Sequence, residues 1–222
     1  MVKGALADYD DNKCCKAQGA KIMKTMKQIM SWVVPIVIGL LIAVLIRTFI
    51  MQPVRVDGPS MLPNLQNNER VLTWKLAKIH RGSVVVFNAD GVDPQVSQRT
   101  YYVKRVIAVP GDTVAAKDGK LYVNGKEVRQ QYINRYQRTQ GTGNWTLKSI
   151  SVQNSWLKNS GATKVPKGEY FVLGDHRSVS NDSRYYGFVP KEKVLGVVQV
   201  GFWSGNQSKK NNVNHEWQHY FE

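Results

Sequence analysis

Apolar residues follow one another without a charge from Ile29 to Ile46, the only apolar run of membrane length in the chain. At roughly 1.5 Å per helical residue this run nearly crosses a hydrocarbon core of ~30 Å, and the side chain of Arg47 can reach the interface beyond it. No pair of small residues follows closely, as a signal peptide cleavage site would require. The pattern therefore predicts an uncleaved transmembrane helix over residues 29–50.

Beyond this run, short segments of β-branched and aromatic residues are separated by turn dipeptides such as Pro110-Gly111 and Asn124-Gly125. An Asn-Gly pair between two such segments is typical of a β-hairpin. Frequent short strands predict a mainly β fold, with an antiparallel β-sheet or partly closed barrel as the core. We expect a hairpin over 121–128 and strands at 54–56, 70–74, 83–87, 101–109, 170–173 and 194–203.

Two parts of the chain break this pattern. Residues 130–165 are rich in Gln, Asn, Ser, Thr and Gly, and we interpret them as a β-rich lobe or extended hairpin inserted into the core. The polar residues 205–222 are expected to form a loosely held C-terminal tail. The predicted organisation is therefore a basic tail over 1–28, the anchor over 29–50, one domain over 51–204 and the final tail.

The chain is strongly basic, with a formal net charge of +15. Lys16, Lys21, Lys24 and Lys27 precede the apolar run, so the positive-inside rule places the N-terminus in the cytoplasm and the large domain outside. A basic domain beside a bilayer is attracted to anionic lipid. Nucleic acid is not expected as a partner, because the basic residues are scattered and no helix-turn-helix or zinc-finger spacing accompanies them.

The two cysteines, Cys14 and Cys15, are adjacent and precede the apolar run. Neighbouring cysteines rarely bridge each other, because of disulfide geometry, and whether these two are modified stays open. Because no cysteine follows Cys15, the domain after the anchor is expected to have no disulfide and no thiolate metal site.

Candidate chemistry begins at Ser60, in the sequence Gly-Pro-Ser-Met-Leu-Pro shortly beyond the apolar run. A turn serine commonly caps a neighbouring backbone group. Here Gly58 and Pro59 before it and Pro63 after it impose an irregular backbone, which could aim the hydroxyl outward and the N–H at a developing oxyanion. A serine hydroxyl still needs a base before it becomes a good nucleophile.

Lys104 is the candidate base. Tyr102 and Val106 share its face of an extended strand, which makes its setting apolar. Burial of this kind lowers the pKa of a lysine, and a fall from ~10.4 towards ~7 corresponds to about 4–5 kcal/mol. Arg105 also has apolar neighbours, but a guanidinium stays protonated and cannot act as a base. None of the four histidines stands in a triad pattern, although triad members lie far apart in sequence and a Ser-His-Asp enzyme stays an alternative.

Four blocks occur in order along the chain: the anchor, Ser60-Met-Leu-Pro, Tyr102-Val-Lys-Arg followed by Pro110-Gly-Asp, and Gly174-Asp-His-Arg-Ser-Val-Ser-Asn-Asp-Ser-Arg. Together they resemble type I signal peptidase, the membrane-bound serine protease that removes secretory signal peptides. The segment from Arg81 to Phe87 also resembles a strand of that family. The resemblance spans roughly residues 30–200, and it excludes most of the expected insertion.

The resemblance implies a Ser-Lys mechanism, with Ser60 as the nucleophile and Lys104 as the general base. Ser180 would hydrogen-bond and orient the Lys104 amine, and the backbone N–H of Ser60 would contribute to an oxyanion hole. The family fold, an all-β catalytic core with a second β lobe inserted, agrees with the strand pattern. Four further residues would support the site: the ion pair of Asp182 with Arg184, and the loop residues Asp175 and Arg177.

The family's substrates carry small residues at the first and third positions before the cut, and the substrate adds as a strand beside shallow apolar pockets. By resemblance, Val56, Met61 and Val103 are candidates for these pockets. The predicted enzyme is a monomeric serine endopeptidase of the cell membrane that cleaves secretory preproteins after Ala-x-Ala sites. It would need no metal or organic cofactor.

The sequence departs from the family pattern at Asn64, where Thr is common, and at His176, where Asn is common. Neither change removes a catalytic group. Two alternatives stay open: another Ser-Lys peptidase, similar to the self-cleaving repressors, and a non-catalytic basic module that binds wall polymer or anionic lipid. The membrane anchor argues against the first, because those proteins are soluble and attach a DNA-binding domain. The second explains the charge but gives no reason for the blocks that contain Ser60, Lys104 and Ser180.

Overall fold

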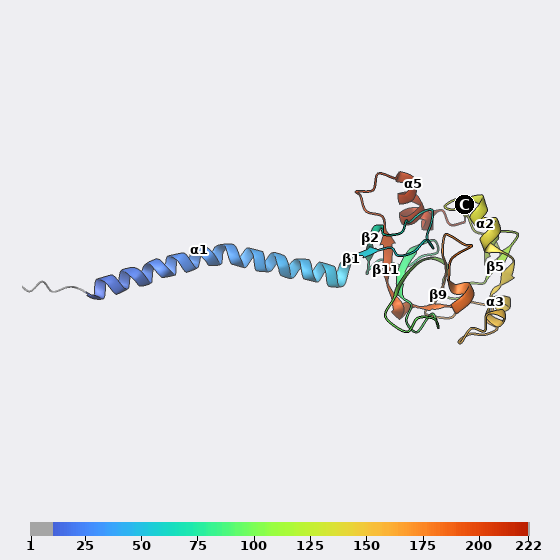
Figure 1. Ribbon diagram of the computed structural model, residues 1–222, viewed down its shortest axis with the longest axis horizontal. Helices are drawn as coiled ribbons and strands as arrows, with labels where there is room; N and C mark the ends of the chain where they lie inside the picture. Colours follow the sequence, from blue (N-terminus) through green and yellow to red (C-terminus); the bar gives the residue numbers. More distant parts are fainter. Residues whose placement is uncertain (1–10, 222) are drawn as a thin grey trace, which may run out of the picture. The chain divides into compact units, whose positions relative to one another are not determined.

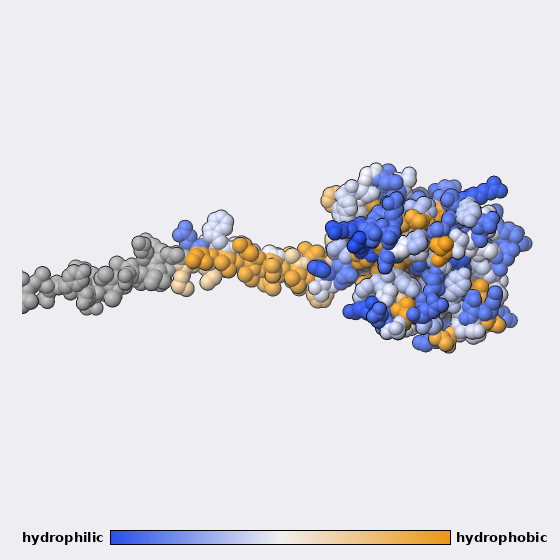
Figure 2. All heavy atoms as spheres, in the orientation of Figure 1, coloured by the Kyte–Doolittle hydropathy of each residue, from blue (hydrophilic) through white to orange (hydrophobic). Residues whose placement is uncertain are grey.

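The computed structural model describes residues 11–221, with side chains from Met26 onward. Helix α1 (Asp11–Leu45) continues into the π-helical turn η1 (Ile46–Ile50). Within it, Met26–Ile50 has a mean hydropathy of 2.8 and exposes its apolar side chains, which form the orange band of Figure 2. This segment is long and apolar enough to cross a membrane, and it contains the predicted anchor. The first ten residues of the predicted N-terminal tail lie outside the described residues.

The rest of the chain is built on a seven-stranded antiparallel sheet (Figure 1). Its strand order is β1-β2-β11-β3-β4-β9-β10, so strands far apart in the sequence become neighbours. The predicted mainly β fold with an antiparallel core is therefore confirmed. The strands are β1 (Met51–Arg55), β2 (Arg70–Trp74), β3 (Val84–Asn88), β4 (Tyr101–Ala108), β9 (Glu169–Leu173), β10 (Val189–Pro190) and β11 (Val194–Gln199).

A second sheet has the order β7-β6-β5-β8. The predicted hairpin is present, and both Asn124 and Gly125 have the positive φ that a tight turn requires, at 52° and 78°. Three of the four strands precede the expected insertion, since this sheet begins at Val114. The strands are β5 (Val114–Lys117), β6 (Lys120–Val123), β7 (Lys126–Glu127) and β8 (Trp145–Thr146).

Residues 130–165 do not form the expected extended hairpin. They contain helices α2 (Arg135–Thr142) and α3 (Leu147–Gln153), and β8 is their only strand among the described residues. The polar residues of this segment start the helices: Asn134 accepts from the Gln137 N–H, and Thr146 accepts from the Ser149 N–H. The β-rich part of the lobe therefore lies mainly before residue 130.

The C-terminal segment is packed against the core, so the prediction of a loosely held tail is wrong. Val213 and Tyr220 are buried, and the Tyr220 hydroxyl donates to the Ile107 carbonyl at 2.5 Å. Asn214 accepts from the Val200 N–H at 2.8 Å. The polar side chains of this segment thus form hydrogen bonds with backbone groups of the core.

Short helices complete the chain: α4 (Ser183–Tyr186), η2 (Lys191–Lys193), α5 (Gln207–Lys210), η3 (Asn211–His215) and η4 (Glu216–Gln218).

Candidate active site

Ser60 lies in a turn that the backbone fixes on both sides. Gly58 has a φ of +82°, a conformation that side chains with a Cβ rarely adopt, and its N–H donates to Asn67 Oδ1 at 2.9 Å. The Leu62 N–H donates to the Pro59 carbonyl at 3.1 Å and closes the turn around Ser60. Ser60 itself is half-buried. The predicted irregular backbone is confirmed, and it holds a serine that solvent or substrate can reach.

Gly174 is where the serine turn meets the loop that follows β9. A Cβ at this glycine would lie 2.2 Å from Ser180 Oγ and 2.6 Å from the carbonyl oxygen of Ser60, so only glycine fits. The His176 N–H also donates to the Ser60 carbonyl, at 3.0 Å. Two segments more than a hundred residues apart in sequence are therefore locked together at this point.

Lys104 lies on β4, opposite Val85 of β3. On its other side Arg105 pairs with Leu173 of β9, and continuing that register by one residue sets Lys104 opposite Gly174. Directly opposed residues of antiparallel strands place their side chains on the same face. The Lys104 side chain therefore leaves the sheet on the face where Ser60 and Ser180 approach Gly174.

The Lys104 side chain is nearly fully buried, at 4% exposed. Burial lowers its pKa from 10.5 to about 8, against the opposing attraction of Asp182. Its Nζ lies 5.4 Å from the centre of the Tyr102 ring, and it forms no hydrogen bond with any residue that the structure describes. At a pH slightly above neutrality, a substantial fraction of the Lys104 amine is thus uncharged.

Ser180 is buried beside the serine turn, at 3% exposed. Its N–H donates to the His176 carbonyl at 3.1 Å. Its Oγ, however, has no hydrogen-bond partner among residues 26–221. The predicted hydrogen bond between Ser180 and Lys104 is therefore not formed here, although both side chains border the same space at Gly174.

Asp182 and Arg184 form the predicted ion pair. Arg184 Nε lies 2.9 Å from Asp182 Oδ1, and Arg184 Nη2 lies 2.9 Å from Oδ2. Burial alone would raise the pKa of Asp182, but Arg184 and the Gly174 N–H hold it below its usual value. The carboxylate thus stays charged, and it accepts from the Gly174 N–H at 3.1 Å.

Asp175 and Arg177 do shape the same loop, but each through partners that the sequence did not indicate. Asp175 forms a fully buried bidentate ion pair with Arg105, with both N–O distances at 2.8 Å. Arg177 donates to the Gly174 carbonyl at 3.0 Å and to Gln130 Oε1 at 2.6 Å.

Asn64 is a further residue of this network that sequence reasoning did not assign to the site. Its Nδ2 donates to Asp175 Oδ2 at 2.8 Å, which connects the segment after Ser60 to the loop after β9. Its Oδ1 accepts from Asn212 at 2.9 Å. The only sequence signal was its departure from the threonine common at this position.

The three pocket candidates, Val56, Met61 and Val103, belong to one apolar cluster. They are 1%, 0% and 7% exposed, and the half-buried Val54 and Leu195 pack against them. Their role as pocket walls stays a prediction. In the part of the chain with described side chains, no group of three or more His, Cys, Asp or Glu residues is placed to hold a metal ion.

Comparison with known proteins gives a consistent result. The family described as signal peptidase, peptidase S26, matches residues 29–203. Signal peptidase IB of Staphylococcus aureus strain COL is 36% identical over 189 residues, which cover 83% of this chain and 95% of that protein. Signal peptidase I of Bacillus licheniformis is 36% identical over 184 residues, covering 81% and 91%. A crystal structure of a signal peptidase I from Enterococcus faecalis is 32% identical, with a TM-score of 0.43, and covers 55% of this chain and 97% of its own.

Proposed function

Because the chain belongs to the signal peptidase family, peptidase S26, it is a serine peptidase that removes signal peptides, and we propose that Ser60 is its nucleophile and Lys104 its general base. The observation that carries this proposal is the convergence at Gly174. That glycine is in contact with Ser60 and Ser180, and the strand register sets the buried Lys104 opposite it.

In the proposed reaction, neutral Lys104 Nζ takes the proton of Ser60 Oγ as this oxygen attacks the scissile carbonyl carbon. Negative charge develops on the carbonyl oxygen, which in this proposal accepts from the Ser60 N–H. Within residues 26–221 this N–H has no other acceptor. The Lys104 ammonium then gives its proton to the leaving amine, and water repeats the sequence on the acyl-serine.

The substrates are preproteins that carry signal peptides. We propose cleavage after Ala-x-Ala sites, with Val56, Met61 and Val103 limiting the size of the accepted side chains. The enzyme would act as a monomer that crosses the membrane once, with residues 1–28 in the cytoplasm, the domain after the anchor outside, and its basic surface against anionic lipid. The exposed apolar side chains of Met26–Ile50 support the assignment of this segment as the membrane anchor.

Cleavage of a preprotein with an Ala-x-Ala site is expected to rise with pH up to about 8. Only the neutral amine accepts a proton, and burial places the pKa of Lys104 at about 8, so kcat/KM should fall roughly tenfold per pH unit below it. The measurement is kcat/KM of the detergent-solubilised full chain from about pH 6 upward, with EDTA present. A profile without this fall, or loss of activity in EDTA, would contradict a neutral lysine base.

Ser180→Ala is expected to reduce cleavage without reducing stability. Its Oγ is buried without a partner, so removing it breaks no hydrogen bond, and the melting temperature should not fall. If this hydroxyl orients Lys104 when substrate binds, its loss should lower kcat by roughly a hundredfold. Ser178→Ala, at an exposed serine of the same loop, is the control. Full activity of Ser180→Ala would remove Ser180 from the mechanism.

A further inference from the structure

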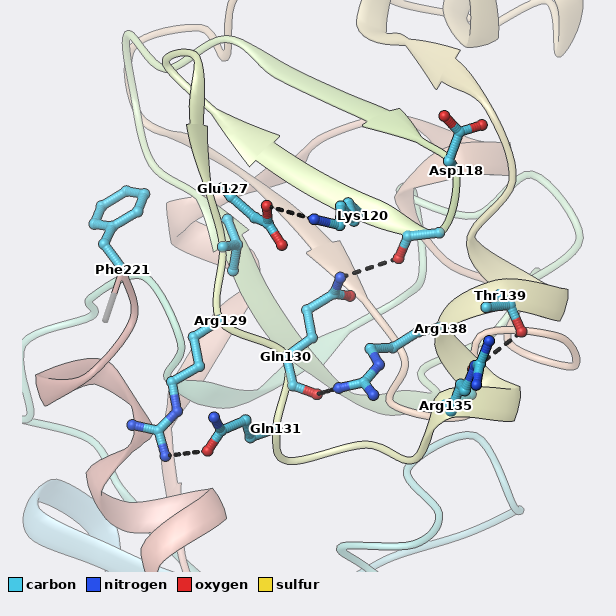
Figure 3. Close-up of a pocket in the computed structure, with 12 residues that line it drawn as sticks. Asp118, Lys120, Glu127, Arg129, Gln130, Gln131, Arg135, Arg138, Thr139 and Phe221 are labelled. Atoms are coloured by element: carbon cyan, nitrogen blue, oxygen red, sulfur yellow. Dashed lines mark hydrogen bonds and ion pairs between the residues drawn. The ribbon is translucent and has the colours of Figure 1, made fainter.

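A surface hollow of about 540 Å³ opens between the second sheet and helix α2 (Figure 3). Neither Ser60 nor Lys104 lines it, and the proposed reaction does not use it. Its floor is the segment after β7, with Gln130 at the centre of the view, and Phe221 stands at one rim. The hollow is therefore separate from the candidate active site.

Positive charge dominates the lining. Lys120 and Glu127 neutralise each other through an ion pair of 2.9 Å. This leaves the guanidinium groups of Arg129, Arg135 and Arg138, against the single carboxylate of Asp118. In Figure 3 that carboxylate lies at the far end of the hollow from Arg129. Outside the lining, the buried Glu216 attracts Arg129, so the uncompensated positive charge of the hollow is that of Arg135 and Arg138.

Most donors of these three arginines are unused. Arg129 Nε is buried without a hydrogen-bond partner among the described residues, while its Nη2 donates to Gln131 Oε1 at 2.8 Å. Arg138 donates once, to the Gln130 carbonyl at a long 3.3 Å. The exposed guanidinium of Arg135 forms no hydrogen bond within residues 26–221. The donors of Arg135 and most of those of Arg138 are therefore free to bind an oxyanion in the hollow.

We propose that this hollow binds the phosphate group of a phosphate ester, with Arg135 and Arg138 as the binding residues, which lie together on α2 in Figure 3. Guanidinium groups match phosphate oxygens with paired hydrogen bonds, and two of them at one site suit a phosphate better than a single carboxylate. The volume exceeds that of a phosphate alone, so it leaves room for an attached alcohol. The ester is either a phospholipid headgroup or a water-soluble phosphate ester.

The hollow shares its walls with the supports of the candidate active site. Gln130 accepts from Arg177 Nη1 at 2.6 Å, and Arg177 in turn donates to the Gly174 carbonyl. On α2, a Cβ at Gly141 would lie 2.2 Å from the Ser178 N, so the helix packs directly on the same loop. A ligand held by Arg135 and Arg138 would therefore bind to a helix that carries part of the active-site loop.

The test is calorimetric titration of glycerol 1-phosphate into the full chain in phosphatidylcholine nanodiscs. We expect saturable binding that weakens at least about tenfold in the variant Arg135→Gln with Arg138→Gln. Arg135→Gln, which breaks no hydrogen bond, should weaken it without any effect on folding. Arg99→Gln removes the same charge from an exposed arginine outside the hollow and should bind like the wild type.

A second arm identifies the source of the ester. In nanodiscs that contain phosphatidylglycerol, weaker apparent binding of glycerol 1-phosphate would indicate that lipid headgroups occupy the hollow. Unchanged binding would indicate a water-soluble ester. The proposal is overturned if no saturable binding occurs, if Arg99→Gln weakens it as much as the hollow variants do, or if acetate at equal ionic strength competes as well as inorganic phosphate.

Discussion

The Ser60→Ala and Lys104→Met variants are each expected to cleave an Ala-x-Ala preprotein about 10⁴-fold more slowly than the wild type. Ser60→Ala removes the attacking oxygen. Lys104→Met removes the base but keeps an unbranched apolar chain in the same buried space, where the amine forms no hydrogen bond with described residues. Both variants should therefore fold normally, which far-ultraviolet circular dichroism and thermal unfolding would check.

The double variant makes this prediction sharper. Because a nucleophile and its base act as one unit, combining Ser60→Ala with Lys104→Met should cost no more than either change alone. Ser178→Ala and Lys191→Met alter an exposed serine and an exposed lysine, and they should retain full activity. Multiplicative losses in the double variant, or wild-type cleavage by either single variant, would refute the proposed dyad.

Local patterns predicted those features that depend on a few neighbouring residues. Alternation and turn dipeptides located the core strands, and Asn124-Gly125 located the hairpin. The glycine and prolines around Ser60 predicted an irregular turn, which the +82° φ of Gly58 confirms. The blocks that resemble signal peptidase predicted the Asp182–Arg184 ion pair, since both residues lie within one short segment.

Features that depend on distant partners were not predictable in this way. Strand alternation did not predict a role for Arg105, because its partner Asp175 lies 70 positions further along the chain. The C-terminal segment is polar by composition, yet Asn212 and Asn214 form hydrogen bonds that buried core groups need. Helix α2 was missed because its residues carry no apolar periodicity, and it is held by its Asn134 cap and by packing at Gly141. Composition indicates how a segment interacts with water on its own. It does not show whether the polar groups of the segment form hydrogen bonds inside the folded domain.

Breaking the Arg105–Asp175 pair is expected to be the most destabilising single change in the domain. Burial lowers the pKa of Arg105, but the adjacent Asp175 carboxylate more than offsets this, and the guanidinium stays charged. Asp175→Asn preserves the shape of the side chain and removes the only carboxylate among residues 26–221 that pairs directly with this buried charge. The cost should be about 3–5 kcal/mol, which corresponds to a fall in Tm of roughly 6–20 °C for a domain of this size.

Thermal unfolding of three variants would separate the buried charge from the loss of contacts. Glu127→Gln breaks the exposed pair with Lys120, whose side chains are 55% and 50% exposed, and should leave Tm unchanged. Replacing both buried partners, with Arg105→Met and Asp175→Leu, removes the uncompensated charge and should recover part of the stability lost in Asp175→Asn. If Asp175→Asn unfolded at the same temperature as Glu127→Gln, the buried pair would not stabilise the loop. A different outcome is that Asp175→Asn unfolds at a lower temperature and the double replacement restores Tm but does not cleave preprotein. The pair would then serve to position Gly174, which precedes Asp175 and lies against the carbonyl of Ser60.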